Sequence, residues 1–222
     1  TFGYDILDRP VGESLPLPDG NRNYYGDAYY YSGCVYGNSS LNRIRETYGP
    51  GAAWIENGKS VKTEYLINAD SGELSCAEFR AEDNGEDVRL IRSGLYAAGE
   101  LSVARTTDED GKVVYTFTDF EGKLLLTRRM NGTEPHDTYI VYDDRGRKRI
   151  VLPPLAADEL TATASWGCNS SEVIKKYGYV YRYDGRDRVI EKKLPGCDPV
   201  HFVYDRSDRL ILKQNGNNRK DG

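Results

Sequence analysis

The sequence predicts an all-β fold of consecutive antiparallel hairpins that form a curved, extended sheet, with one short helix near residues 154–163. Three observations predict it: a six-residue phrase with turn chemistry recurs, the segments before it alternate along a strand, and tyrosine is abundant. The chain has 222 residues, with 18 Tyr and a single Met. Because Tyr fits half-buried strands and a chain of this length can bury a sizeable core, the composition favours a β-rich domain.

The recurring phrase is a Tyr-Asp pair, two spacer residues, a Gly or a second Asp, and then a basic residue. Its four full copies are Tyr4, Asp5, Asp8 and Arg9; Tyr142, Asp143, Gly146 and Arg147; Tyr183, Asp184, Asp187 and Arg188; and Tyr204, Asp205, Asp208 and Arg209. Two looser copies lack the tyrosine and contain Asp108, Gly111 and Lys112, and Asp119, Gly122 and Lys123. Such repetition indicates an array whose units bury their apolar faces mainly against one another.

Each phrase predicts the tip of a β-hairpin. The Asp side chain can accept backbone N–H groups two residues further on and so start a turn. Three residues after it, a short hairpin loop needs left-handed backbone, which Gly adopts freely and Asp tolerates. We therefore expect positive φ at Gly146, Asp187 and Asp208.

The tyrosines of the phrase occupy equal positions before equal turns. If hairpins pair in sequence, these positions fall in register, and aromatic cross-strand pairs contribute about 0.2–1 kcal/mol each. We therefore expect Tyr142, Tyr183 and Tyr204 to stack side by side as a ladder on one face of the sheet.

The spacing of the phrases divides a single repeat region, residues 1–222, into segments. Asp143 and Asp184 lie 41 residues apart, whereas Asp184 and Asp205 lie 21 apart, which predicts that one repeat in the longer interval has been replaced. Pro153 and Pro154, followed by good helix formers, predict the short helix there. The expected segments are an irregular N-terminal wrapping segment (1–60), hairpin repeats (61–153), an insert with the helix (154–176), two C-terminal repeats (177–214) and a frayed tail (215–222).

Three stretches carry a resemblance to a known family: residues 46–54, residues 95–101, and the phrase at 183–188 with the following residues 190–196. They resemble the YD-repeat region of bacterial RHS-type proteins, which are large secreted or surface-displayed polypeptides that include wall-associated and polymorphic-toxin proteins. The resemblance covers nearly the whole chain and is thinnest between Val11 and Leu41. The sequence departs from the pattern at Thr118, where the family pattern has Tyr.

The resemblance implies a non-catalytic structural segment, part of a β-strand shell or stalk that encloses or displays a downstream effector domain. It also implies a secreted or cell-surface location, although the chain begins without a signal peptide, and it makes the remainder of a longer polypeptide the main partner. The alternative is a module that binds cell-surface carbohydrate or protein, with Tyr24, Tyr29 and Tyr31 as stacking residues. Exposed strand edges at residues 200–204 or 210–213 would also permit self-association.

Other functions find little support in the residues. The net charge of −5 offers no basic face to nucleic acid, and no segment is apolar enough to span a membrane. His136 and His201 have no nucleophile at a recognisable spacing, so we expect no enzyme activity and no cofactor.

The cysteines also lack the spacing of a metal site. None of the four forms a close pair with another; they are Cys34, Cys76, Cys168 and Cys197. We expect free thiols and no metal, with a disulfide between Cys168 and Cys197 as the alternative.

Overall fold

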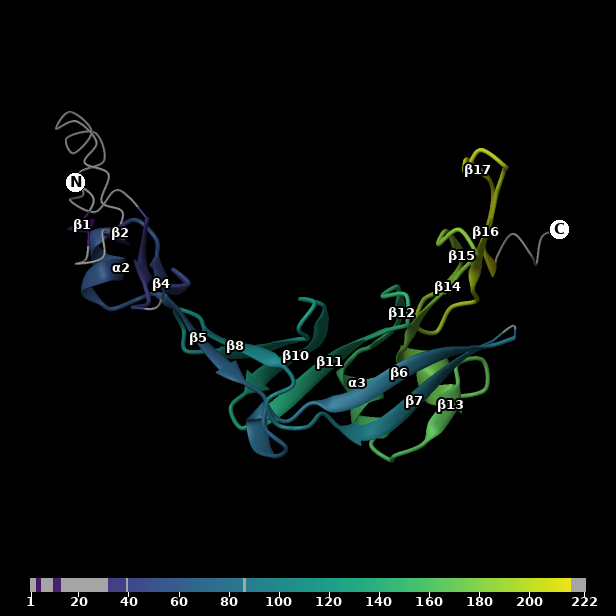
Figure 1. The fold of residues 1–222 in the computed structure, drawn as a ribbon, viewed down its shortest axis with the longest axis horizontal. Coiled ribbons are helices and arrows are strands. Elements are labelled where there is room, and N and C mark those ends of the chain that lie inside the picture. The colour runs from purple at the N-terminus through teal and green to yellow at the C-terminus, as the bar shows by residue number, and fades with distance from the viewer. Residues whose placement is uncertain (1–2, 5–9, 13–31, 39, 86, 217–222) are drawn as a thin grey trace. The chain divides into compact units, whose positions relative to one another are not determined.

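The computed structural model describes residues 3–4, 10–12, 32–38, 40–85 and 87–216 (Figure 1). The chain divides into two compact units, each made of several segments. Unit 1 consists of Thr1–Leu66, Val103–Tyr115 and Arg129–Glu134, and unit 2 consists of Ile67–Ser102, Thr116–Arg128 and Pro135–Gly222. Strands β9 (Val113–Thr118) and β10 (Leu124–Asn131) therefore contribute residues to both units.

Unit 1 is built from short antiparallel strands. Strand β1 (Gly3–Tyr4) pairs with β2 (Pro10–Gly12). Strand β3 (Gly33–Tyr36) pairs with β4 (Ile44–Tyr48), which pairs with β5 (Val61–Ile67), and β8 (Ser102–Thr107) lies on the other side of β5. A short helix, α2 (Ala52–Glu56), connects β4 to β5. Gly51 precedes this helix at a φ of 119°, a conformation that favours glycine.

Unit 2 contains a long antiparallel sheet with the strand order β17-β16-β15-β14-β12-β11-β10-β9. The strands not yet bounded are β11 (Glu134–Tyr142), β12 (Lys148–Leu152), β14 (Tyr179–Tyr183), β15 (Val189–Lys193), β16 (Val200–Tyr204) and β17 (Leu210–Gln214). The hairpins β11/β12, β14/β15 and β16/β17 each shift register just before Tyr142, Tyr183 and Tyr204. This irregularity is the bulge that a short loop with one left-handed residue produces.

A second sheet of unit 2 has the order β13-β7-β6. Strand β6 (Ala77–Asn84) follows a 3-10 turn, η1 (Gly72–Leu74), and forms a hairpin with β7 (Asp87–Leu95). Strand β13 (Ser165–Gly167) comes from the insert and pairs with β7, with Ser165 opposite Ile91. We expected the structure to be dominated by strands that pair with their neighbours in sequence, and β13 is an exception to this pattern.

The core of unit 2 lies between this second sheet and the long sheet. Tyr139 of β11 contacts Phe79 of β6 edge-on, with the ring centroids 4.9 Å apart, and its hydroxyl accepts a 3.5 Å hydrogen bond from the N–H of Ala77. The largest fully buried apolar side chains of the unit are Phe117, Leu90, Leu126, Ile150, Leu152, Ile174, Val88 and Val141. Each large aliphatic side chain buried in this way contributes about 1.5–3 kcal/mol to folding.

The insert supplies two helices beside this core, α3 (Pro154–Glu159) and α4 (Glu172–Tyr177) (Figure 1). Helix α3 begins with Pro154 at its first position, as the two prolines predict. Helix α4 begins after Ser171, whose side chain accepts a hydrogen bond from the N–H of Ile174, and its last turn carries Lys175 and Lys176.

The expected fold class is confirmed. In the part of the chain that the structure describes, strands make up 49%, the sheets are antiparallel, and the helices are short. The expectation of a single short helix was incomplete, because α2 and α4 accompany α3. Only a single residue before each of these helices, Gly51 or the capping residue Ser171, marks where it begins. The helices themselves are too short to show the periodic pattern by which helices are predicted.

Candidate functional site

The three full phrases of the described residues form hairpin tips with one common geometry. In each tip, one carboxylate oxygen of the Asp accepts the backbone N–H groups two and four residues later, at 2.8–3.1 Å. The looser copies at Asp108 and Asp119 form the same two bonds. The predicted positive φ is confirmed at the fourth position of each full tip, with 74° at Gly146, 60° at Asp187 and 62° at Asp208.

Arg147, the last residue of its phrase, binds two hairpins at once. Its Nε donates to the carboxylate of Asp143 in its own tip at 2.8 Å. Its Nη1 donates to the carboxylate of Asp187 in the next tip at 2.7 Å, and lies 3.5 Å from the carbonyl oxygen of Asp184. The side chain of Arg147 is 15% exposed. The carboxylate at the left-handed position of one tip is thus bound by the arginine of the tip before it.

Arg188 repeats this arrangement at the next junction. Its Nε donates to Asp184 at 2.7 Å, and its Nη1 donates to the carboxylate of Asp208 at 2.6 Å and to the carbonyl of Asp205 at 3.2 Å. Arg186 also reaches Asp208, at 3.0 Å. Two successive junctions therefore use the same atoms in the same roles.

The tyrosine of each phrase packs on the arginine of the preceding phrase. The guanidinium of Arg147 lies 5.1 Å from the ring centroid of Tyr183, and that of Arg188 lies 4.8 Å from the ring of Tyr204. The Tyr183 hydroxyl donates to the carbonyl of Lys148 at 2.9 Å, and the Tyr204 hydroxyl donates to the equivalent carbonyl of Val189 at 3.0 Å.

The expected ladder of stacked tyrosines was therefore wrong in its contacts. Tyr142, Tyr183 and Tyr204 do occupy equivalent register positions, opposite Lys148, Val189 and Leu210. Equivalent residues of successive hairpins are separated by two strand spacings, roughly 10 Å, whereas aromatic rings interact at about 4.5–7 Å. Among the described residues, the basic side chains of the return strands fill the space between these rings.

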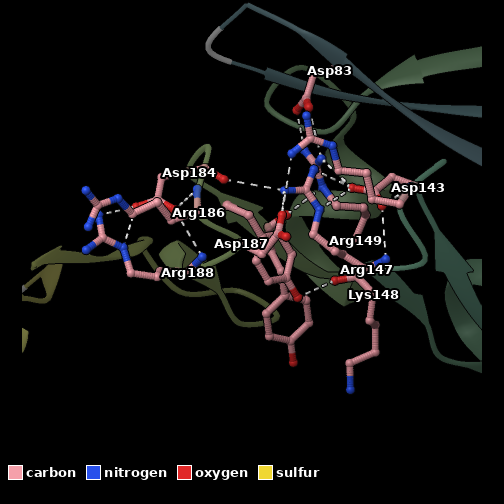
Figure 2. A network of polar contacts seen from close by, with 12 residues as sticks. Asp83, Asp143, Arg147, Lys148, Arg149, Asp184, Arg186, Asp187 and Arg188 are labelled. Carbon is pink, nitrogen blue, oxygen red and sulfur yellow. Dashed lines mark hydrogen bonds and ion pairs between the residues drawn. The ribbon is translucent and has the colours of Figure 1, made fainter. Parts of the chain in front are cut away.

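A buried arginine that sequence reasoning missed completes the first tip (Figure 2). The side chain of Arg149 is 1% exposed and donates to Asp143 at 3.1 Å and to Asp83 of β6. Its Nε donates to the carbonyl of Tyr181 at 3.1 Å. Because Asp83 lies 66 residues earlier, this ion pair joins the second sheet to the long sheet. Its only sequence signal is the run of three basic residues Arg147, Lys148 and Arg149, which does not reveal a partner so far away.

These contacts shift the acid-base equilibria of the tips. The hydrogen bond from Arg188 holds the pKa of Asp184 at about 2. Burial acts to raise the pKa of Asp143, but hydrogen bonds from Arg147 and Arg149 outweigh it and place the pKa below its ordinary value. The pKa of Asp83 is lowered by its hydrogen bond with Arg149. The tips therefore hold carboxylates in their ionised form, which favours ion pairing over proton transfer near neutral pH.

A second buried ion pair lies on the long sheet facing the core of unit 2. Arg128 binds both carboxylate oxygens of Asp137, at 2.7 and 2.6 Å, and also donates to the carbonyls of Glu73 and Ser75. It borders a cavity of about 200 Å³, which Arg92 also lines. With five donors and four such partners, Arg128 is engaged as a structural clamp.

Of the remaining predicted site residues, the structure describes Asp119, Gly122 and Tyr4. Asp119 and Gly122 form a tip of the same geometry, with Gly122 at a φ of 83°. Tyr4 lies on β1 and pairs with Pro10, the same offset as Tyr142 with Lys148. Outside the described residues lie the remaining predictions for the first phrase and the stacking cluster, namely Asp5, Asp8, Arg9, Tyr24, Tyr29 and Tyr31.

Groups with other chemistry are dispersed. All four cysteines are free thiols; Cys76 and Cys168 are buried and Cys197 is exposed. Burial raises the pKa of Cys76 and of Cys168 to about 12. Within the part of the chain that the structure describes, no three His, Cys, Asp or Glu side chains gather in a way that could hold a metal ion. No helix among these residues is both long and apolar enough to cross a lipid bilayer.

Comparison with known proteins gives one partial match. Residues 2–67 match a family described as "Domain of unknown function (DUF6443)". A comparison with curated proteins gave no match. The matched segment precedes the three full tips whose geometry is described above, so the tips are interpreted from their own contacts.

Proposed function

We propose that this chain is a non-catalytic scaffold: a structural repeat segment of a secreted or surface-displayed RHS-type protein, where it forms part of a β-strand shell or stalk. The observation that supports this most directly is the coupling of consecutive hairpins through Arg147 and Arg188. These ion pairs hold each hairpin of the sheet to the next, as contacts between neighbouring units do in repeat proteins. The paired side chains are therefore not available to bind a substrate.

The acid-base state of the tips supports the same proposal. A general acid or base works best with a pKa near the working pH, whereas Asp184 and Asp143 have lowered pKa values and are paired with arginine. The buried thiols of Cys76 and Cys168 have raised pKa values, which makes them poor nucleophiles. In this proposal the main partner is the remainder of a longer polypeptide, and a downstream effector domain is what the shell encloses or displays.

Binding of carbohydrate or protein through Tyr24, Tyr29 and Tyr31 is the alternative outcome. A glycan array with the purified chain, together with hydrolysis assays on polysaccharides and peptides, separates the two. A scaffold is expected to give neither binding nor turnover. Micromolar glycan binding that is lost in Tyr29→Ala or Tyr31→Ala would establish the binding module instead. Turnover that disappears when one acidic residue is replaced would overturn the scaffold proposal in favour of an enzyme.

A further inference from the structure

Neighbouring tips on the same end of the long sheet are matched in residue type. The tips at Asp119, Asp143, Asp184 and Asp205 follow one another along this end, because they join β9/β10, β11/β12, β14/β15 and β16/β17. At each junction, the last residue of one phrase faces the left-handed position of the next. The three facing pairs are Lys123 with Gly146, Arg147 with Asp187, and Arg188 with Asp208.

The lysine junction differs from the two arginine junctions in both residues. A Cβ placed on Gly146 would lie 2.9 Å from Nζ of Lys123, so the flexible end of this lysine packs directly against the glycine. Lys123 is paired within its own tip to Glu121 and makes no fork. In the other two junctions, the arginine donates from Nε to the Asp of its own tip and from Nη1 to the Asp of the next tip. The second of these bonds needs a carboxylate at the left-handed position. The two arginine junctions thus have aspartate at the left-handed position, and the lysine junction has glycine.

In the last tip, Arg209 binds the Asp of its own tip, but no described tip follows that could supply a second carboxylate. Nε of Arg209 donates to Asp205 at 2.7 Å, as in the two earlier tips. The side chain of Arg209 is 78% exposed, compared with 22% for Arg188. Strand β17 is the outermost strand of the order at this end, and no other described strand pairs with its free edge. On β17, Leu210, Ile211 and Leu212 are 51%, 63% and 57% exposed.

We propose that the free edge of β17, with Arg209, is a docking surface for an antiparallel β-hairpin whose tip reads Tyr-Asp-x-x-Asp. This rests on the proposed scaffold function and adds which hairpin the scaffold accepts. The junction at Arg188 defines the contacts: the hairpin's second Asp binds Nη1 of Arg209, its Tyr ring packs on the guanidinium, and its Tyr hydroxyl donates to the carbonyl of Leu210. The strand edge supplies backbone hydrogen bonds to any strand, and Arg209 supplies the selection.

The test uses the full chain and a fluorescent, head-to-tail cyclised peptide with the sequence of residues 200–214, which is the hairpin that Arg188 binds within the chain. A matched peptide carries Asp208→Gly, which keeps the left-handed backbone and removes the carboxylate. Fluorescence polarisation is expected to show about tenfold tighter binding of the Asp peptide than of the Gly peptide by the unmodified chain. The Arg209→Lys chain is expected to lose most of this preference, because an ammonium cannot reproduce the forked contact with two carboxylates.

Each outcome decides the proposal. Equal binding of both peptides, or a preference that Arg209→Lys leaves unchanged, would show that the edge pairs without selection; absence of binding would show that it is not a docking surface. Because Arg209 is exposed, unchanged circular dichroism and urea midpoint of the variant confirm that its fold is intact. The scaffold proposal is tested separately by the glycan and hydrolysis assays. Glycan binding or turnover would overturn it even if the chain prefers the Asp peptide. If the chain binds neither peptide and shows neither activity, the docking proposal fails and the scaffold proposal stands.

Discussion

At the scale of single residues, the aspartate at the left-handed position combines two roles that glycine cannot. Asp187 and Asp208 tolerate positive φ, at 60° and 62°, and their carboxylates bind the arginine of the preceding tip. Asp is among the few residue types besides Gly that enter this region at low cost. At these two positions the aspartate therefore serves the ion pair between tips as well as the turn.

Asp208→Val is expected to destabilise the protein by about 1–3 kcal/mol, because a β-branched residue resists positive φ. Asp208→Gly removes the same carboxylate but keeps the backbone, so its urea midpoint should fall less. The comparison isolates backbone strain. Equal midpoints for the Val variant and the unmodified chain would contradict the assigned turn geometry.

Arg149 gives a second expectation at this scale. Arg149→Met keeps the buried aliphatic stem and removes the cation between Asp83 and Asp143. We expect a loss of about 2–3 kcal/mol, below the usual range for a broken buried pair because Asp143 retains Arg147 and Asp83 is 62% exposed. Arg186→Met, at a side chain that is 58% exposed, is the matched control and should change the urea midpoint little.

At the scale of the hairpin, the sequence predicted the tips well because their signals are local. The bonds of Asp143 reach only four residues along the chain, so turn chemistry alone identifies them. The contacts of the tyrosines were not predictable in the same way, because the return strand between two repeats places Arg147 and Arg188 where a ring was expected. The ion pair of Arg149 with Asp83 spans 66 residues and has no local signal.

The matching of neighbouring tips can be tested within the chain. Arg188→Lys and Asp208→Gly should each lower the urea midpoint, because each leaves one half of the junction without its partner. The double variant recreates the pair seen at Lys123 and Gly146. Its urea midpoint should therefore fall by less than the sum of the falls in the two single variants. Strict additivity of the two changes would show that the residues at this junction act independently.

Acid should weaken the tips in a defined range of pH. The pKa values of Asp83, Asp143, Asp184 and Asp205 are lowered in the folded state. A carboxylate with a lowered pKa stabilises the fold at every pH above its pKa in the unfolded chain, which is 3.8 for Asp. This stabilisation is lost as the pH falls through the pKa of the folded state, about 2 for Asp184. Urea midpoints should therefore decline between pH 4 and pH 2, and less steeply in Arg149→Met. A midpoint that is constant over this range would contradict the shifts.

At the scale of the whole molecule, the fold class followed from the repeated phrase, but the second sheet of unit 2 did not. The phrase predicts one array, whereas the β6/β7 hairpin pairs with β13 of the insert and covers one face of the long sheet. The prolines before α3 marked the interruption of the array without showing that its residues, such as Leu160 and Ile174, would enter the core. Burial of this kind depends on partners far apart in the chain.

Two buried thiols report on the opening of this core. Cys197 should react with a thiol reagent in the native protein, whereas Cys76 and Cys168 should be protected by burial and by pKa values raised to about 12. Because both lie in the core of unit 2, they should become reactive at one common rate that rises with urea, measured by mass spectrometry in a Cys197→Ser background. Labelling of either thiol well before the other would show that the unit opens in parts.

The pairing of β13 with β7 also sets an order for synthesis. Ser165 is opposite Ile91, so the edge of β7 waits for a partner that leaves the ribosome about 70 residues later. At typical elongation rates this interval lasts roughly 4–15 s, far longer than a hairpin needs to form. The nascent β6/β7 hairpin therefore displays a free strand edge while the hairpins of the long sheet emerge beside it. A pause in translation before β13 has left the ribosome would prolong this exposure, whereas a later pause would not.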